Sequence, residues 1–363
     1  MKLQVTQENL NKALSSVARV ASSRGTLSIL ANVLIKTSKN RLSLSATNLD
    51  IAITHYIGAK VSEEGSITVP ARLMQDFVSS LPEGIIELDL EETKLHVSTD
   101  QYKSVVNGIV ADDFPVMPAM TNGTNWKVDA SLFKKALQQV VFAASGDETR
   151  PVLTGILLKT NNNQLSMVAT DSYRLAEKQI GSQNNEINLL VPASAMQDLL
   201  RVIGDESGDI NIRHDEQQIL FTIGDIELVS RQLDGKYPDY KNLIPKSFEV
   251  TADLKKADFI NVTKVSSLFA RESAGSVTIV VDEKNQELSI RSVASQLGEN
   301  NATAKAKAKG TGSITLNSRY LLDALNVING ENIQFSFNGK LEPTMLSDPE
   351  AKDYKHIIMP LKS

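Results

Sequence analysis

The chain contains the same nine-residue pattern twice. VPARLMQDF begins at Val69, and VPASAMQDL begins 122 residues later, at Val191. A weaker third copy, LNSRYLLDA, begins at Leu316. A repeat at a near-constant spacing constrains the fold strongly, because each copy is one structural unit and the spacing gives its size. The 363 residues therefore divide into three units, each of about 120 residues, which is an ordinary domain size.

Other segments recur in the same order. VTQENLNKAL at Val5 is followed by VDASLFKKAL at Val128 and VTADLKKADF at Val250. LSLSATNLDIAI at Leu42 returns as LSMVATDSYRLA at Leu165. Several markers at one offset make two accidentally similar helices a poor explanation. We predict three tandem domains of similar fold, which cover residues 1–123, 124–247 and 248–363.

Each copy has the pattern of an α+β domain. A strand-like run precedes a helical one, several strands follow, and a second helix leads to further strands. Thr6, Asp129 and Thr251 stand where the first helix of each copy needs an N-cap, and Pro70 and Pro192 fit the first turn of the second helix. The six predicted helices cover residues 7–20, 71–81, 130–144, 193–203, 253–268 and 318–328.

Composition excludes several classes of protein. The chain has no Cys, which rules out disulfides and Cys-ligated metals, and none of its four His lies at ligand spacing with another. There is no signal peptide and no apolar run long enough for a membrane helix, so a cytoplasmic protein without membrane contact is expected. No P-loop, GxGxxG or nucleophile elbow occurs, and we expect no cofactor, no metal and no enzyme active site.

Charge is distributed unevenly. The six predicted helices contain ten basic and six acidic residues, a net charge of +4, whereas the whole chain carries −5. Ordinary scatter over solvated helix faces is one explanation. In a repeated fold the same excess indicates a positive helical layer and an acidic remainder, which favours contact with a phosphate backbone on one face only. No recognition helix is visible, so such contact would carry no base information.

Three motifs carry a resemblance to a known family. VATDSYRLA begins at Val168, YPDY begins at Tyr237, and the chain ends in IIMPLKS from Ile357. Together with the triple repeat, they resemble the bacterial sliding clamps, the beta subunits of DNA polymerase III, over the whole chain. The resemblance implies a non-catalytic processivity factor, in which two chains form a head-to-tail ring with two helices per domain on the inner wall and antiparallel sheets outside.

The resemblance also implies partners. They are a second copy of the chain, duplex DNA inside the ring, a clamp loader, the replicative polymerase and other proteins with a clamp-binding motif. The chain lacks an ATPase motif of its own, in keeping with a separate loader. The alternative function is a peptide-binding scaffold that does not encircle DNA.

Residue by residue, the resemblance predicts three sites. Arg24 and Arg150 stand where relatives contact DNA, although Pro151 and Val152 replace aromatic residues there. With the basic residues of the predicted helices, the predicted DNA-binding set is Arg24, Arg150, Lys12, Arg72, Lys134, Lys135, Arg201 and Lys255. The predicted dimer interface includes Ser104, Val106, Leu268 and Phe269, with residues 101–110 as the edge strand.

A hydrophobic partner-peptide pocket is the third predicted site. Its matching positions are Leu153, Thr170, Ser172, Tyr173, Arg174, Leu175, Pro238, Leu243, Asn317, Tyr320, Leu341, Pro343, Ile357, Ile358, Met359, Pro360 and Leu361. From sequence alone, ordinary packing in core strands is the favoured interpretation of Leu175, Ile357 and Ile358. Tyr173, Asn242, Ala274 and the final Lys362–Ser363 depart from some relatives, which leaves the peptide specificity open.

Overall fold

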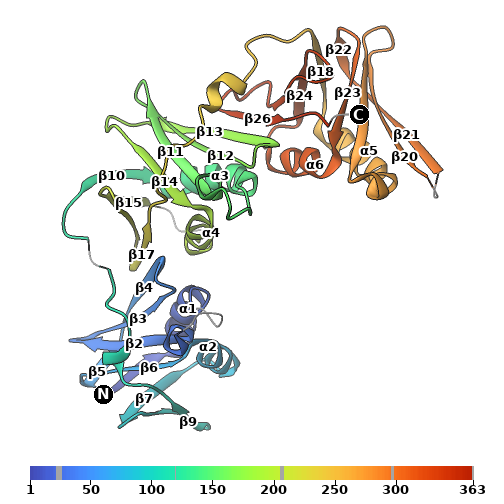
Figure 1. Cartoon of the computed structure of the whole chain (residues 1–363). Coiled ribbons are helices and arrows are strands. Elements are labelled where there is room, and N and C mark those ends of the chain that lie inside the picture. The colour runs from blue at the N-terminus through green and yellow to red at the C-terminus, as the bar shows by residue number, and fades with distance from the viewer. Residues whose placement is uncertain (22–26, 119, 205–207, 296–297, 362–363) are drawn as a thin grey trace. The chain divides into compact units, whose positions relative to one another are not determined.

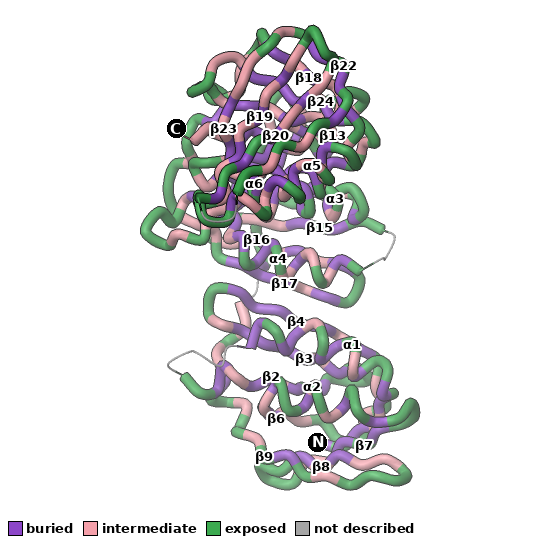
Figure 2. Tube along the Cα trace, turned by 90° about the vertical axis from the view of Figure 1, so that its right-hand side faces the viewer, coloured by how far each residue is buried: buried purple, intermediate pink, exposed green. Residues whose placement is uncertain are grey.

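The structure of the chain is a computed structural model (Figure 1). It describes residues 1–21, 27–118, 120–204, 208–295 and 298–361. Within them, the predicted order of strands and helices is present three times. Strands and the inner sides of the helices are largely buried, while most loops are exposed (Figure 2).

The first repeat begins with β1 and contains two helices. Its elements are β1 (Lys2–Thr6), α1 (Gln7–Val17), η1 (Ser28–Ala31), β2 (Asn32–Ser38), β3 (Arg41–Thr47), β4 (Ile51–Gly58), β5 (Lys60–Glu63), β6 (Ser66–Pro70), α2 (Ala71–Ser80), β7 (Ile85–Glu91), β8 (Lys94–Ser98), β9 (Lys103–Asn107) and η2 (Ala111–Asp113).

The second and third repeats follow the same order. The second contains β10 (Thr124–Asp129), α3 (Ala130–Val140), η3 (Val141–Ala143), η4 (Pro151–Thr154), β11 (Gly155–Asn161), β12 (Gln164–Thr170), β13 (Arg174–Ser182), β14 (Asn188–Pro192), α4 (Ala193–Val202), β15 (Asp209–His214), β16 (Gln218–Ile223), β17 (Ile226–Arg231) and η5 (Tyr240–Leu243). The third contains β18 (Val250–Lys255), α5 (Lys256–Phe269), η6 (Arg271–Ser273), β19 (Ser276–Asp282), β20 (Glu287–Ala294), β21 (Gly298–Lys305), β22 (Lys307–Lys309), β23 (Gly312–Asn317), α6 (Ser318–Val327), β24 (Asn332–Phe337), β25 (Thr344–Ser347) and β26 (Tyr354–Ile358).

Four antiparallel sheets organise the described strands. Their orders are β5-β1-β7-β8-β9, β10-β15-β16-β17-β4-β3-β2-β6, β14-β11-β12-β13-β26-β25-β24-β18-β22 and β21-β20-β19-β23. Two sheets cross from one repeat to the next, because β4 pairs with β17 and β13 pairs with β26. We call the β4–β17 pairing the first junction and the β13–β26 pairing the second junction. The α+β class with antiparallel sheets is confirmed.

Two compact units contain one junction each. Met1–Ser131 and Ser194–Gln232 form the first unit, and Leu132–Ala193 and Leu233–Ser363 form the second. The division passes through the second repeat, because that repeat supplies strands to both junction sheets. The domain boundaries inferred from the repeat therefore stay a prediction.

The apolar stripe of α1 has the expected role. Leu10, Leu14 and Val17 have no exposed surface, and the helix packs on β3 and β4 and beside α2. Its predicted cap is confirmed, since the Thr6 hydroxyl accepts a hydrogen bond from the Asn9 amide at 3.4 Å. In the third repeat, α5 likewise lies beside α6 (Figure 1).

Three helix boundaries differ from the prediction by three or more residues. The helix predicted over 253–268 begins at Lys256, because residues 250–255 form β18 and pair with β24. Thr251 therefore lies in a strand and is not an N-cap. Helix α1 ends at Val17, which leaves Arg19 outside it, and α3 ends at Val140 and continues as a short 3-10 turn.

The prolines lie one residue before the position predicted for them. Pro70 ends β6 and Pro192 ends β14, and each directly precedes its helix. With the observed boundaries, the six helices of the described chain contain eight basic and five acidic residues, so their net charge is +3. Within the described ranges, every helix is too short or too polar to cross a membrane.

Candidate functional site

A stiff loop joins β12 to β13 at the second junction. One carboxylate oxygen of Asp171 accepts hydrogen bonds from the amides of Tyr173 and Arg174, both at 2.9 Å. The Thr170 hydroxyl donates to the Arg174 carbonyl at 2.6 Å, and Ser172 has a left-handed backbone with φ of 77°. These bonds close the turn and leave Tyr173 58% exposed.

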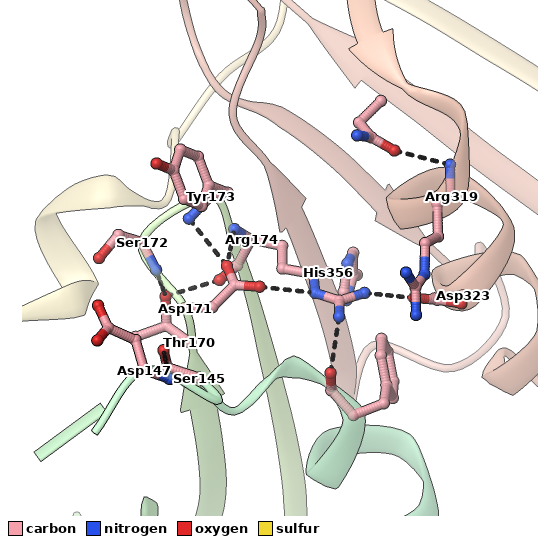
Figure 3. A network of polar contacts seen from close by, with 12 residues as sticks. Ser145, Asp147, Thr170, Asp171, Ser172, Tyr173, Arg174, Arg319, Asp323 and His356 are labelled. Atoms are coloured by element: carbon pink, nitrogen blue, oxygen red, sulfur yellow. Dashed lines mark hydrogen bonds and ion pairs between the residues drawn. The ribbon is translucent and has the colours of Figure 1, made fainter. Parts of the chain in front are cut away.

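Arg174 connects this loop to two other segments (Figure 3). Its guanidinium donates to Asp171 at 3.1 Å, to Asp323 of α6 at 2.6 Å and to the Phe142 carbonyl at 2.8 Å. It also lies over the ring of Tyr320, 4.5 Å from the centroid. Only 11% of the Arg174 side chain is exposed. Planar recognition of two carboxylates and an aromatic face is a property that Arg has and Lys lacks.

His356 lies behind this cation. Its ring stacks on Phe142 with centroids 5.6 Å apart, and Nδ1 is 3.2 Å from the Tyr354 hydroxyl. Complete burial, with the Arg174 charge as a second cause, lowers the pKa of His356 to about 3. The imidazole is therefore neutral at pH 7 and does not repel Arg174.

An apolar cluster forms the floor next to the loop. Leu175 of β13 pairs directly with Ile357 of β26, and both side chains are 2% exposed. The buried cluster consists of Leu157, Val168, Leu175, Leu190, Tyr240 and Ile357, and the partly buried Val152, Leu233, Tyr237, Ile244 and Met345 pack against it.

Tyr240 places a polar group inside this cluster. Its hydroxyl donates to Glu177 Oε1 at 2.8 Å, and burial, followed by the Glu177 charge, raises the pKa of Tyr240. The phenol therefore stays protonated and satisfies the buried carboxylate. Both polar groups are therefore paired with each other inside the cluster.

The C-terminal segment forms one margin of the surface. The Met359 amide donates to the Tyr173 carbonyl at 2.8 Å, and the Leu361 amide donates to Thr315 at 2.9 Å. Two apolar residues of the predicted pocket are exposed, Leu243 at 45% and Leu341 at 67%. An exposed apolar patch over a buried apolar floor is typical of a site for hydrophobic peptide anchors.

The predicted pocket residues therefore divide into a floor and a rim. The buried ones are Leu153, Thr170, Leu175, Ile357 and Ile358. The partly exposed ones are Arg174, Asn317, Tyr320, Pro343, Met359, Pro360 and Leu361, and the exposed ones are Ser172, Tyr173, Pro238, Leu243 and Leu341. The sequence did not predict four further residues that surround Arg174, namely Asp171, Phe142, Asp323 and His356. Only their interactions with Arg174 show that they belong to the site.

Two departures from relatives have local roles. Asn242 donates to Asp239 at 2.8 Å on the exposed side of η5. Ala274 has a left-handed backbone with φ of 53°, and its carbonyl accepts a hydrogen bond from Asn317, the N-cap of α6. Lys362 and Ser363 lie outside the described residues.

Some predicted DNA-binding residues are brought together. Lys12 of α1 and Arg201 of α4 line one cavity of about 530 Å³, with Arg19 and Asp198. Arg201 pairs with Asp198 at 2.6 Å. Burial raises the pKa of Asp198, while the Arg201 and Arg19 charges oppose that rise. The cavity is lined by three cations and one carboxylate, a combination that attracts phosphate.

The other predicted DNA-binding residues lie apart from this cavity. Arg72 is exposed on α2, and Lys134 and Lys135 are neighbours on α3. Lys255 is exposed at the end of β18 and not on a helix as predicted. Arg24 lies outside the described residues.

Arg150 lies beside the second-junction loop. Its guanidinium pairs with Asp147 at 3.0 Å and donates to the Ser172 hydroxyl at 3.0 Å. Its role in DNA binding stays a prediction, and the bond to Ser172 places it beside the predicted peptide pocket.

The predicted dimer residues include one edge strand. β9 ends the five-stranded sheet, and its outer backbone edge is not paired within the described chain. Ser104 is half-buried and Val106 packs inside, at 5% exposure, whereas Val105 is 53% exposed. Leu268, at 51%, and the partly exposed Phe269 end α5. A partner would therefore meet Val105 and the β9 backbone, and not the Val106 side chain.

Comparison with known proteins defines the class of this fold. Models of the N-terminal, central and C-terminal domains of the DNA polymerase III beta subunit match residues 1–118, 127–239 and 241–362. The beta sliding clamp of Synechococcus elongatus is 33% identical, over all of this chain and 99% of that protein. The beta sliding clamp of Bacillus subtilis is 28% identical over the full length of both chains.

Solved structures agree. The Bacillus subtilis DNA polymerase sliding clamp has a TM-score of 0.95 at 27% identity and covers 100% of this chain and 99% of its own. A Pseudomonas aeruginosa sliding clamp bound to griselimycin has a TM-score of 0.95 at 26% identity, over 100% of both chains. The molecule is thus a protein of three tandem clamp domains. The chain belongs to the family of DNA polymerase III beta subunits, the bacterial sliding clamps.

Proposed function

We propose that two copies of this chain join head to tail in a closed ring around duplex DNA, slide along it and tether the replicative polymerase. The chain is then a processivity factor without catalytic chemistry of its own. A clamp loader opens and places the ring, and other proteins with a suitable peptide compete for the same surface.

The observation that carries this proposal is the threefold repeat with its uneven charge. Six helices carry a net charge of +3 in a chain of net charge −5. Attraction to phosphates is then weak, screened by salt and independent of base sequence. Such attraction suits a protein that must move along DNA while a closed ring prevents its escape.

The second-junction surface supports the tethering role. Leu175 and Ile357 supply an apolar floor, and Arg174 holds α6 beside it. A short apolar peptide from a polymerase would bury its anchors there, which is how small peptide motifs obtain affinity from pre-formed surfaces.

The β9 edge supports the ring. An unpaired strand edge is a template for another strand, and a head-to-tail contact that closes generates a ring. Leu268 and Phe269 at the end of α5 supply apolar surface for such a contact.

Retention on DNA tests the proposal. The chain is loaded by a bacterial clamp loader with ATP onto a nicked circular plasmid, and bound protein is measured after gel filtration. We expect retention on the circle and loss after a restriction enzyme linearises it. Equal retention on both forms, or none on either while peptide binding is intact, contradicts encirclement. The second of these results favours a peptide-binding scaffold.

A further inference from the structure

The first junction contains a copy of the second-junction loop. The Thr47 hydroxyl donates to the Ile51 carbonyl at 2.9 Å, and the Asn48 side-chain oxygen accepts from the amides of Asp50 and Ile51 at 3.1 and 2.8 Å. Leu49 has a left-handed backbone with φ of 78°. The 170–174 loop makes the same bonds at the same positions, with Ser172 in place of Leu49.

The strands beside the loop correspond as well. The Arg231 amide donates to the Asp50 carbonyl at 3.0 Å, as the Met359 amide does to Tyr173. Ala52 pairs with Val229 across β4 and β17, as Leu175 pairs with Ile357. The first junction therefore reproduces the backbone of the proposed peptide surface.

An open cavity of about 510 Å³ lies between this backbone and the segment 115–118. That volume lies within the usual range of ligand sites, roughly 300–1,000 Å³. We call it the first-junction cavity. All its lining residues belong to the first compact unit: Thr47, Asn48, Leu49, Asp50, Ile51, Ala52, Pro115, Val116, Pro118, Gln218, Val229 and Arg231.

The side chains make this cavity different from the second-junction surface. Ala52 and Val229, at 3% and 8% exposure, form a smaller apolar floor than Leu175 and Ile357. Ile51 occupies in the first junction the position that Arg174 occupies in the second. The first junction therefore has no counterpart of the hydrogen bonds and ion pairs that Arg174 makes. The two floors therefore differ in shape and apolar area, and the two sites should prefer different ligands.

Exposed apolar side chains flank the cavity. Leu49 is 51% exposed and Val116 is 96% exposed. A left-handed backbone costs a residue other than Gly about 1–2 kcal/mol, and Leu has no polar group that could bond locally in return. An exposed leucine with a left-handed backbone therefore lowers the stability of the fold, and stability does not explain its presence at position 49.

The charge at the rim selects the ligand. Arg231 is exposed and occupies the place of Met359, and Asp50 is its cross-strand neighbour. The two side chains form no ion pair, and Arg231 has no other ion-pair partner within the described ranges. Its guanidinium is therefore open to an external carboxylate, which Arg binds with two parallel hydrogen bonds.

We propose that the first-junction cavity is a second peptide site, which binds a short extended segment of a partner protein carrying aliphatic side chains next to one acidic residue. The aliphatic groups lie against Leu49, Val116 and Val229, and the carboxylate pairs with Arg231. The choice of a peptide rests on the proposed function of the second-junction surface, whose backbone this cavity shares. Each chain then offers two sites of different specificity.

Methyl NMR of the full chain tests this with two capped tripeptides, acetyl-Leu-Val-Asp-amide and acetyl-Leu-Val-Lys-amide. We expect the acidic probe to shift the methyl signals of Leu49, Val116 and Val229 at millimolar concentrations. The basic probe should bind about tenfold more weakly, which corresponds to the loss of one charge-assisted hydrogen bond.

Two variants separate the sites. Arg231→Glu should reverse the preference between the probes at the first junction. Met359→Glu should leave that preference unchanged while it blocks an apolar peptide at Leu175 and Ile357. Equal binding of both probes, insensitivity to R231E, or shifts confined to Leu175 and Ile357 would overturn the proposal. The last result would leave the proposed tethering surface intact, whereas failure of the parent chain to bind an apolar polymerase-tail peptide at Leu175 and Ile357 would contradict only that surface.

Discussion

Arg174 holds three segments of the second junction together. It bonds to Asp171 in its own loop, to Asp323 of α6 and to the carbonyl of Phe142. The VATDSYRLA motif identified Arg174 by resemblance. Its partners are distant in sequence, and no local pattern pairs residue 174 with residue 323. The role of the residue was thus predictable, whereas the contacts that give it that role were not.

Arg174→Met should destabilise the chain by about 3 kcal/mol, because removal of a mostly buried cation leaves two carboxylates without their partner. Urea unfolding at pH 7 measures this. Arg201→Met is the matched control, since Asp198 occupies in α4 the place that Asp323 has in α6. Arg201 is 51% exposed, and its loss should cost below about 1 kcal/mol. Equal losses in the two variants would contradict the role of Arg174.

His356 should make stability depend on pH. Its pKa is lowered from 6.5 to about 3, so the unfolded chain binds a proton that the folded chain excludes. The resulting stability is complete above pH 6.5 and is lost as the pH falls toward 3. From pH 7 to pH 5, this one group should remove about 2 kcal/mol.

The variant His356→Gln cannot take up this proton. Its free energy of unfolding should fall by about 2 kcal/mol less than that of the parent chain between pH 7 and 5. Parallel curves for the parent chain and H356Q would show that His356 does not titrate as inferred.

At the level of elements, the six helices were predictable because their apolar spacing is local. The start of α5 was not. Residues 250–255 lie in β18 because they pair with β24, about 80 residues later in the chain. Asp253, counted as helical in the prediction, accepts a hydrogen bond from Gln334 across those strands. A strand that precedes a helix directly has no loop to mark the change.

The cap of α6 offers an element-level test. The Asn317 side-chain oxygen accepts from the Arg319 amide at 2.9 Å, and its NH₂ group donates to Ala274 at 3.2 Å. Asn317→Ala should lower the midpoint of urea unfolding by an amount that corresponds to about 1 kcal/mol. Asn317→Asp keeps the accepting oxygen and should lose less. If N317A and N317D unfold alike, the cap contributes nothing.

At the scale of the whole molecule, the repeat gives three similar domains whose junctions have different side chains. The first junction has Ile51, Ala52 and Arg231 where the second has Arg174, Leu175 and Met359. One backbone design therefore supports two surfaces of different chemistry. Tests of assembly must accordingly use residues that lie at neither junction.

Leu268→Asp should weaken dimerisation, because it places a charge in the proposed apolar contact at the end of α5. Sedimentation velocity should show a shift from dimer toward monomer, with a rise in the dimer dissociation constant of about tenfold or more. Val105→Asp on the β9 edge should act in the same direction. Leu73→Asp is the control, since Leu73 is equally exposed, at 56%, on α2 and outside the proposed contact. A dimer unaffected by L268D and V105D would place the contact elsewhere.

The sequence by itself determined the number of repeats, the order of strands and helices, and the family. Repetition and periodicity are local properties, so they can be read without coordinates. The tertiary structure decided which side chains surround Arg174, that Val106 faces inward, and that the loops at residues 47–51 and 170–174 make the same hydrogen bonds. These depend on pairing between strands far apart in the chain, which the local pattern does not specify.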